Sequence, residues 1–173
     1  MVDELLDLTI RPAIADDAHA IAEVHIASWR HAYAGVVDEA FLSDLDVERR
    51  TDEWAARLAE ISHRTMILVA EQEGTVVGFA MLGPSRDEDA ELGGQEIYDI
   101  YLQPDAWGHG VARELMRTVL SDTPHETPLT LWVLAANERA RHFYRRHGFV
   151  PDGVERLEPI GEENHLEVRY RRN

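Results

Sequence analysis

The chain has 173 residues and an apolar fraction of 45%, which fit a single globular domain, residues 1–173, with a sizeable core. Its net charge is −16, with 33 acidic residues against 17 basic ones that are all arginine. This balance argues against nucleic-acid binding, which needs a basic surface, and it suits a cationic substrate, although solubility alone also accounts for it. The absence of cysteine excludes disulfides, thiolate metal sites and thiol nucleophiles.

The sequence carries no signal for a membrane or for export. Its longest apolar runs are broken by Arg, Asp or Glu before they reach the length of a membrane span. The first residues, MVDELLDLTI, are acidic and lack the basic region and apolar stretch of a secretory signal. We therefore expect a cytoplasmic protein with no membrane partner.

The first part of the chain predicts one strand followed by three helices. The strand covers residues 8–11, and the helices cover residues 16–33, 39–45 and 46–61. Asp16 and Asp46 are expected to cap the first and third helices, because a carboxylate accepts hydrogen bonds from the free amides of a first turn. Ile21, His25 and Trp29 lie on the apolar side of the first helix.

The rest of the chain alternates strands with helices. Strands are expected at residues 66–71, 76–82, 95–102, 129–134, 154–158 and 166–171, and helices at 111–120 and 137–147. A Glu-Gly-Thr turn joins the first two of these strands, the polar segment 84–94 is a loop, and Gly148 ends the last helix. The order βααα-ββ-β-α-β-α-ββ predicts an α/β or α+β fold, with helices packed on a mixed sheet.

A glycine-bearing turn follows the strand at residues 95–102 and precedes a helix. It reads Trp107-Gly108-His109-Gly110-Val111-Ala112. Glycines let an anion approach the backbone, and the first amides of a helix have no internal partners, so the turn suits a pyrophosphate. It lacks the Gly-Lys-Ser/Thr of a P-loop and the Gly-x-Gly-x-x-Gly spacing of a dinucleotide fold. Alone, it predicts only an anion site.

The turn resembles motif A of the GCN5-related N-acetyltransferase (GNAT) family, Arg/Gln-x-x-Gly-x-Gly/Ala, with Trp107 in the place of Arg or Gln. A second block, from Asn137 through Ala140 and Tyr144 to Gly148-Phe149, resembles the family's motif B. The resemblance covers roughly residues 10–170. It implies a mixed, mostly antiparallel central sheet that is flanked by helices and splayed between its fourth and fifth strands.

The resemblance also implies direct transfer of an acetyl group from acetyl-CoA to an amine, with no metal. Tyr144 is the expected acid for the leaving thiolate. Without the second block a core tyrosine would be favoured, because Ala140, Phe143 and Tyr144 share one face of the helix. Glu96 is the expected base, acting directly or through water, unless it is a solvated carboxylate. Strand alternation places Glu96, Tyr98, Ile100 and Leu102 on one face and Asp99 on the other. The expected cofactor contacts are Ile100, Tyr101, Leu102, Gly108, His109, Gly110, Val111, Ala112, Arg113, Asn137 and Tyr144.

The family's acceptor pocket is built from its first helices and last strands. In this chain those segments offer Trp29, Tyr33 and His165, together with His25 and His31. Trp29 and Tyr33 are one helical turn apart and would frame a cation, unless they belong to the core. The leading hypothesis is an enzyme that acetylates a primary amine of a small molecule. The alternatives are a protein or peptide N-acetyltransferase and a non-catalytic acyl-CoA-binding regulatory module, and a homodimer is expected by analogy with the family.

Overall fold

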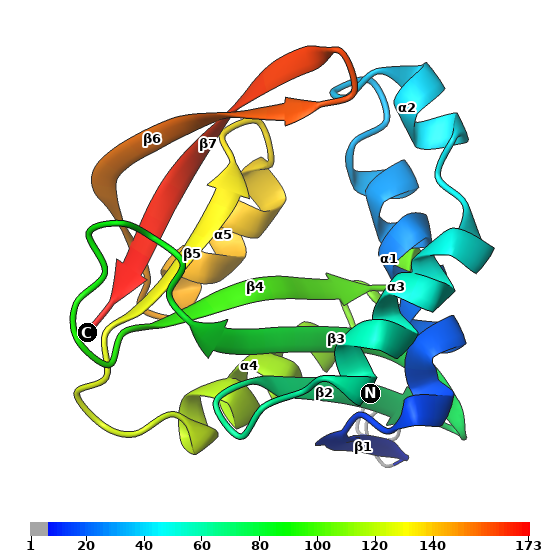
Figure 1. Ribbon diagram of the computed structural model, residues 1–173, viewed down its shortest axis with the longest axis horizontal. Coiled ribbons are helices and arrows are strands. Elements are labelled where there is room, and N and C mark those ends of the chain that lie inside the picture. Colours follow the sequence, from blue (N-terminus) through cyan, green and yellow to red (C-terminus); the bar gives the residue numbers. More distant parts are fainter. Residues whose placement is uncertain (1–6) are drawn as a thin grey trace.

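The computed structural model describes residues 7–173 of the chain. Its elements follow the predicted order, which confirms the fold class (Figure 1). They are β1 (Leu8–Pro12), α1 (Ala18–Ala32), α2 (Glu39–Ser43), α3 (Val47–Ala59), β2 (Met66–Gln72), β3 (Thr75–Pro84), β4 (Gln95–Leu102), α4 (Val111–Asp122), β5 (Leu129–Leu134), α5 (Glu138–Arg146), β6 (Val150–Ile160) and β7 (Glu163–Arg172). Within this part of the chain, no helix is both long and apolar enough to cross a membrane.

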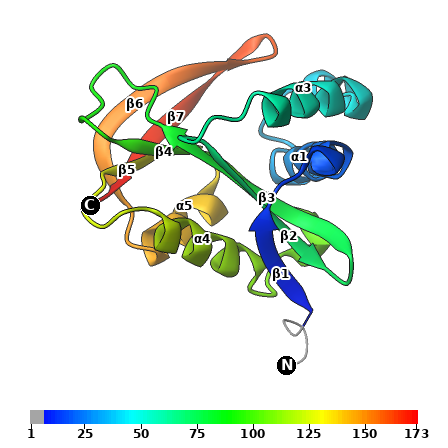
Figure 2. The same cartoon turned by 60° about the horizontal axis from the view of Figure 1, so that its bottom comes forward.

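The strands form one seven-stranded sheet in the order β1-β2-β3-β4-β5-β7-β6. All neighbours are antiparallel except β4 and β5, which are parallel. Helices α1 and α3 cover one face, and α4 and α5 cover the other (Figure 2). Each face buries its own apolar cluster, centred on Trp54 and Phe79 under α1 and α3 and on Leu115 and Phe149 beside α4 and α5.

The sheet opens between β4 and β5. These strands pair only from Gln95 opposite Leu129 to Ile97 opposite Leu131, after which they diverge. The remaining part of β4 therefore has one edge that is not paired with β5, and backbone groups on that edge are available to a ligand. This is the splay between the fourth and fifth strands that the resemblance implied.

A β-bulge at Tyr98 changes which residues of β4 share a face. In the ladder with β3, Asp99 pairs with Met81 and Ile97 pairs with Leu82, so Tyr98 is an extra residue. Ile97, Ile100 and Leu102 consequently pack on the α4/α5 side, while Tyr101 packs against the α1/α3 cluster. The strict alternation expected from sequence is wrong here. Asp99 lies on the same side as Glu96, because the extra residue reverses the alternation.

Two boundaries differ from the sequence-based expectation. A short 3₁₀ turn (Ala15–Asp17) precedes α1, and Asp16 does not cap that helix. Asp17 instead accepts hydrogen bonds from the Arg11 guanidinium and from the amide of Ile14, which fixes the entry to α1. Strands β6 and β7 extend well beyond the predicted ranges. The two strands pair with each other along the hairpin, so their length depends on this pairing rather than on the local apolar pattern.

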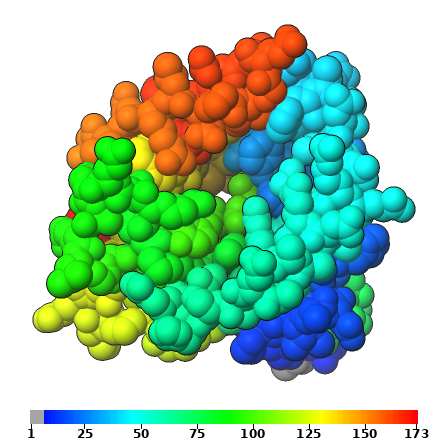
Figure 3. All heavy atoms as spheres, viewed as in Figure 1, coloured from blue at the N-terminus to red at the C-terminus, as the bar shows by residue number. Residues whose placement is uncertain are grey.

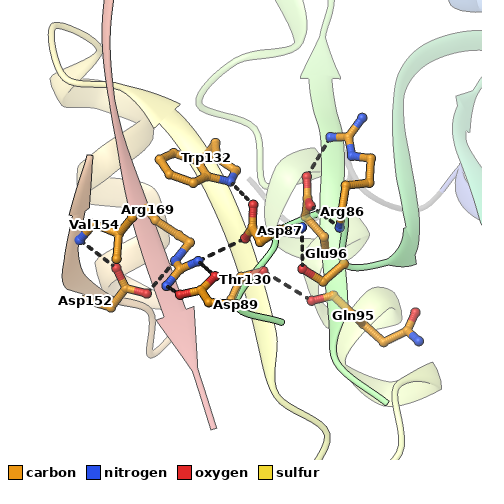
Figure 4. A network of polar contacts seen from close by, with 11 residues as sticks. Arg86, Asp87, Asp89, Gln95, Glu96, Thr130, Trp132, Asp152, Val154 and Arg169 are labelled. Atoms are coloured by element: carbon orange, nitrogen blue, oxygen red, sulfur yellow. Dashed lines mark hydrogen bonds and ion pairs between the residues drawn. The ribbon is translucent and has the colours of Figure 1, made fainter. Parts of the chain in front are cut away.

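The loop between β3 and β4, residues 85–94, is tied to β7 (Figure 4). Arg169 of β7 donates to Asp87 and Asp89 of the loop and to Asp152 of β6, at distances from 2.6 to 3.2 Å. Asp87 also accepts from the indole of Trp132 at 2.9 Å. These bonds hold the loop across the divergence of β4 and β5.

Candidate functional site

A cavity of about 690 Å³ passes through the opening between β4 and β5. Its walls come from α1 and α2 on one side, from β4 and the start of α4 in the middle, and from β5, α5, β6 and β7 on the other. It therefore lies where the sheet has left backbone groups unpaired. Figure 3 shows the molecule hollowed at the centre of one face, between the segments coloured green, orange and cyan.

One end of the cavity is the glycine turn before α4. Gly108 and Gly110 have φ angles of 82° and 85°, in the left-handed region that a side chain disfavours. Gly110 is the N-cap of α4 and provides no side-chain cap, so the first amides of the helix remain available to an anion. Both glycines line the cavity. The turn thus has the backbone geometry that the sequence predicted for an anion site.

Trp107 closes this end of the cavity from the side. Its ring lies 4.7 Å from the ring of His31 on α1 and 4.1 Å from the guanidinium carbon of Arg139 on α5. A cation over an indole face is attracted by the π-electrons of the ring. Where the family pattern has a single polar side chain, this chain has an aromatic ring that positions a cation beside the turn.

Tyr144 lies on the wall of the cavity where β4 and β5 diverge. It belongs to α5, and only 8% of the residue is exposed. Its hydroxyl has no hydrogen-bond partner among residues 7–173. Burial raises the pKa of Tyr144, and the nearby charges of Tyr33 and Asp99 raise it further. The phenol is therefore fully protonated at neutral pH, which is the form that donates a proton.

Asn137 connects the two helical walls. Its Oδ1 accepts from the amide of Ala140 at 3.1 Å, which confirms the predicted N-cap of α5. Its Nδ2 donates to the hydroxyl of Tyr33 on α1 at 3.3 Å. Both residues line the cavity, so this bond joins its α1 and α5 walls.

The two carboxylates of β4 differ in their surroundings. Glu96 is 2% exposed and does not line the cavity; its oxygens accept from the amide of Arg86 at 3.1 Å and from its guanidinium at 2.6 Å (Figure 4). Asp99 lines the cavity and has neither a hydrogen bond nor an ion pair within residues 7–173. Burial raises the pKa of Asp99 to about 6, although Arg57, Arg86 and Arg50 lower it.

The far end of the cavity is aromatic and acidic. Trp29 and Tyr33 pack edge to face with ring centroids 4.7 Å apart and both line it, so the aromatic stripe on α1 is at once core and wall. The wall is completed by Phe41, Trp132, Arg156, Glu158, Ile160 and Glu167. Burial raises the pKa of Glu167, while its hydrogen bond from Arg156 at 2.8 Å lowers it. His25 and His165 lie outside this wall.

A sequence model described as the Acetyltransferase (GNAT) family matches residues 22–149, most of the chain. The chain belongs to the GNAT family. An uncharacterised N-acetyltransferase of Mycobacterium tuberculosis is 33% identical over 171 residues, which cover 96% of this chain and 96% of that protein. An uncharacterised N-acetyltransferase of Bacillus subtilis is 33% identical over 109 residues, which cover 63% of this chain and 60% of that protein, so this match spans about three-fifths of the relative.

Solved structures show the same fold. The PaiA N-acetyltransferase of Thermoplasma acidophilum, crystallised with coenzyme A, superposes with a TM-score of 0.70 at 20% identity and covers 94% of this chain and 98% of that one. The yncA protein of Salmonella typhimurium, solved with its cofactor acetyl-CoA, superposes with a TM-score of 0.70 at 19% identity and covers 95% and 92%. Family membership makes this GNAT chain an acyltransferase of the N-acetyltransferase class.

The structure brings most of the predicted GNAT site residues together. Apart from His109, all of the residues expected to contact the cofactor line the same cavity: Ile100, Tyr101, Leu102, Gly108, Gly110, Val111, Ala112, Arg113, Asn137 and Tyr144. Their contacts with a bound substrate stay a prediction. Two further arginines of α5, Arg141 and Arg145, donate to the hydroxyl of Tyr170.

Sequence reasoning missed several residues of the GNAT cavity. Arg139 and Arg146 of α5 line it, Arg139 beside Trp107 of the glycine turn, and Trp132 and Phe41 line its aromatic end. The arginines resemble ordinary surface residues of a highly charged helix. A signal was nevertheless present, because four of the chain's 17 arginines fall within one short stretch, residues 139–146, soon after Asn137.

His25 makes the stability of this GNAT fold sensitive to acid. Its Nδ1 accepts from the indole of Trp54 at 3.3 Å, and its ring stacks on Tyr101 at 5.2 Å. Burial lowers the pKa of His25 to about 3, from about 6.5 in the unfolded chain. The unfolded chain therefore binds a proton first, so this contribution to the free energy of unfolding is present above pH 6.5 and is lost as the pH falls towards 3, by about 1.4 kcal/mol per pH unit.

We expect that His25→Gln, whose amide oxygen can still accept from Trp54, removes the contribution of His25 to the pH dependence of the free energy of unfolding. Urea unfolding at several pH values between 4 and 6 should show that this free energy falls less steeply towards low pH in the variant than in the wild-type protein. Asp99 acts in the opposite direction, because its raised pKa lets the folded chain bind a proton first between about pH 6 and 4. Asp99 is present in both proteins, so its contribution cancels when they are compared. Equal slopes of the free energy of unfolding against pH would contradict the role of His25.

Proposed function

We propose that this GNAT chain transfers an acetyl group from acetyl-CoA directly to a primary amine of a small molecule. The observation that carries the proposal is the cavity through the splayed sheet. It has an anion turn at one end, an aromatic and acidic chamber at the other, and Tyr144 between them. The two ends suit the two substrates of an acetyl transfer.

The donor end fits the chemistry of coenzyme A. Its pyrophosphate would accept hydrogen bonds from the free amides at Gly110 and the start of α4, and Arg113, Arg139 and Arg146 line the same cavity. Asn137 and the unpaired edge of β4 would bind the amides of the pantetheine arm. The bound coenzyme A of the Thermoplasma protein and the acetyl-CoA of the Salmonella protein support this choice of donor.

The acceptor end favours a small molecule because the fold covers it. The turn between β6 and β7 packs on α2, where a Cβ atom built at Gly161 would lie 3.2 Å from Phe41 (Figure 1). Tyr33, Leu42 and Ile160 bury one another in the same contact. A polypeptide acceptor requires an extended groove, and the contact between the β6–β7 turn and α2 closes one side of this end of the cavity. The carboxylates of Asp99, Glu158 and Glu167 outnumber Arg156 there, which favours a cationic amine.

Three groups of the chain serve the transfer. The hydroxyl of Tyr144 donates a proton to the leaving sulfur. A backbone amide near Tyr101 or Leu102, on the free edge of β4, stabilises the charge that develops on the thioester oxygen. A carboxylate takes the proton that the amine loses. No side chain forms a covalent bond with the acetyl group.

The proposal is tested by following thiol release from acetyl-CoA across a panel of primary amines and peptides. We expect turnover above hydrolysis with at least one small amine, and mass spectrometry of the product should show the added acetyl group. Turnover with peptides alone would replace the small acceptor by a polypeptide. Binding of coenzyme A with no turnover on any acceptor would overturn the enzymatic function.

The glycine turn provides a direct test of donor binding. A side chain at Gly108 would enter open space beside the turn, where no atom lies within 4 Å of the Cβ position. We expect Gly108→Val to weaken the affinity for coenzyme A by about tenfold or more, measured by calorimetry, because a branched residue both strains the turn by about 1–2 kcal/mol and blocks the approach of a phosphate.

Gly153→Val is the matched control for this substitution. Gly153 has a similar φ of 88°, also has no atom within 4 Å of its Cβ position, and lies on β6 away from the turn. It should lose comparable stability and keep its affinity for coenzyme A. An equal loss of affinity in both variants would show that strain, rather than the anion site, controls binding.

Two further expectations accompany the proposed function. The net charge of −16 and the absence of cysteine support a cytoplasmic enzyme. The homodimer rests on analogy with the family, and light scattering of the purified chain would test it.

A further inference from the structure

We propose that Asp99, rather than Glu96, is the general base that takes the proton from the acceptor amine, and that Glu96 positions the surrounding charges. This assignment rests on the proposed function. It follows from which carboxylate of β4 faces the cavity after the bulge at Tyr98.

The environment of Glu96 excludes it from direct contact with an acceptor. Both of its oxygens are occupied by donors of Arg86, and the guanidinium of Arg86 is held in turn over the ring of Tyr98 at 4.0 Å. The Glu96 carboxylate is also 2% exposed and does not line the cavity, so an acceptor in the cavity does not reach it.

Asp99 meets the geometric requirement of a base. Its carboxylate faces the cavity without a competing partner in residues 7–173, and it lies close enough to raise the pKa of both Tyr101 and Tyr144. The base and the acid therefore line the same cavity, one from β4 and the other from α5. A base must reach the proton that it removes, and Asp99 is the β4 carboxylate that opens onto the acceptor space.

The charges around Asp99 place its titration in a useful range. Burial raises its pKa, Arg57 and Arg50 of α3 and Arg86 of the β3–β4 loop lower it, and Glu96 raises it, so that the pKa is about 6. The carboxylate is then ionised at neutral pH and still binds a proton readily. Glu96 thus acts on Asp99 through its charge and by holding Arg86.

The transfer balances with these groups. The ammonium form of the acceptor first loses one proton to solvent. The nitrogen lone pair of the resulting neutral amine forms the bond to the acetyl carbon, and the carbon–sulfur bond breaks with its electron pair on sulfur. The extra proton on nitrogen passes to Asp99, and the sulfur takes the proton of Tyr144. Exchange of both protons with solvent restores the two side chains and leaves an amide and a free thiol.

The test compares Asp99→Asn with Glu96→Gln in the full chain. The acceptor is the amine with the highest kcat/KM in a panel of 2-phenylethylamine, tryptamine, putrescine and ethanolamine. We expect Asp99→Asn to lower kcat about 100-fold or more and Glu96→Gln to lower it by less than about tenfold. Calorimetry with coenzyme A should give unchanged affinities, and thermal unfolding should show that Asp99→Asn is folded, because it removes a buried charge that has no partner.

The pH profile of kcat/KM identifies the base. A primary alkylamine titrates near pKa 10, so the logarithm of kcat/KM should rise with a slope of about one below that pH and of about two below pH 6, where Asp99 is also protonated. In Asp99→Asn the slope stays near one. In Glu96→Gln the steep limb remains and moves to lower pH, because a charge that raises the pKa of Asp99 is gone.

Three results would overturn the assignment. If Asp99→Asn keeps its turnover and the steep limb while Glu96→Gln loses both, Glu96 is the base and Asp99 is not. If the wild-type chain acetylates no amine of the panel, the proposed function fails and the assignment fails with it. Loss of turnover in Asp99→Asn together with loss of coenzyme A binding would show that Asp99 serves the structure of the cavity instead.

Discussion

Replacing Tyr144 by phenylalanine should lower kcat about 100- to 10,000-fold, the range over which a positioned acid accelerates such a step. The phenol is the proton donor proposed for the sulfur, and its raised pKa keeps it protonated across the neutral range. The substitution removes one oxygen that has no hydrogen-bond partner in the described chain, so it leaves no unpaired polar group behind. The affinity for coenzyme A should therefore change little.

The measurement is thiol release under saturating acetyl-CoA and amine, with calorimetry for coenzyme A. Tyr33→Phe is the control, because Tyr33 also lines the cavity and its hydroxyl accepts only the bond from Asn137. It should retain turnover within about tenfold, since it removes a hydrogen bond and not a proton donor. A Tyr144→Phe variant with full turnover would refute the acid role and leave Tyr144 as a core tyrosine.

The local parts of this site could be predicted from sequence because each depends on a short segment. Gly108 and Gly110 specify a turn by their own backbone freedom, and Asn137 caps α5 through a bond to Ala140 three residues on. The splay of the sheet was predicted from the family resemblance. No local pattern encodes it, because it depends on how far two strands remain paired.

The position of Asp99 shows why the remainder could not be predicted. The bulge at Tyr98 arises from the pairing of β4 with β3 and leaves no mark in the sequence of β4. Simple alternation of side chains along β4 therefore assigns Asp99 to the wrong face of the sheet. The aromatic end of the cavity has a similar origin. Phe41 and Ile160 are distant in sequence and meet because the β6–β7 hairpin packs on α2. Contacts of this kind follow from tertiary packing rather than from sequence spacing.

Replacing Arg169 by methionine should reduce the free energy of unfolding by about 3–5 kcal/mol. The Arg169 side chain is 8% exposed, and those of its partners Asp87 and Asp152 are 9% and 15% exposed. Methionine fills a similar volume but leaves both carboxylates charged, largely buried and without their cation. Urea unfolding with linear extrapolation measures the difference.

Arg171→Met, two residues further along β7, is the matched control. Arg171 binds Glu91 and Asn173 at the surface, and the Glu91 side chain is 54% exposed, so its loss should cost less than about 1 kcal/mol. Similar losses in the two variants would show that the Arg169 network is no stronger than a surface pair.

The Arg169 network also bears on catalysis, because the loop that Arg169 holds is the loop that brings Arg86 to Glu96. Release of that loop should therefore shift the acid limb of the pH profile as well as lower stability.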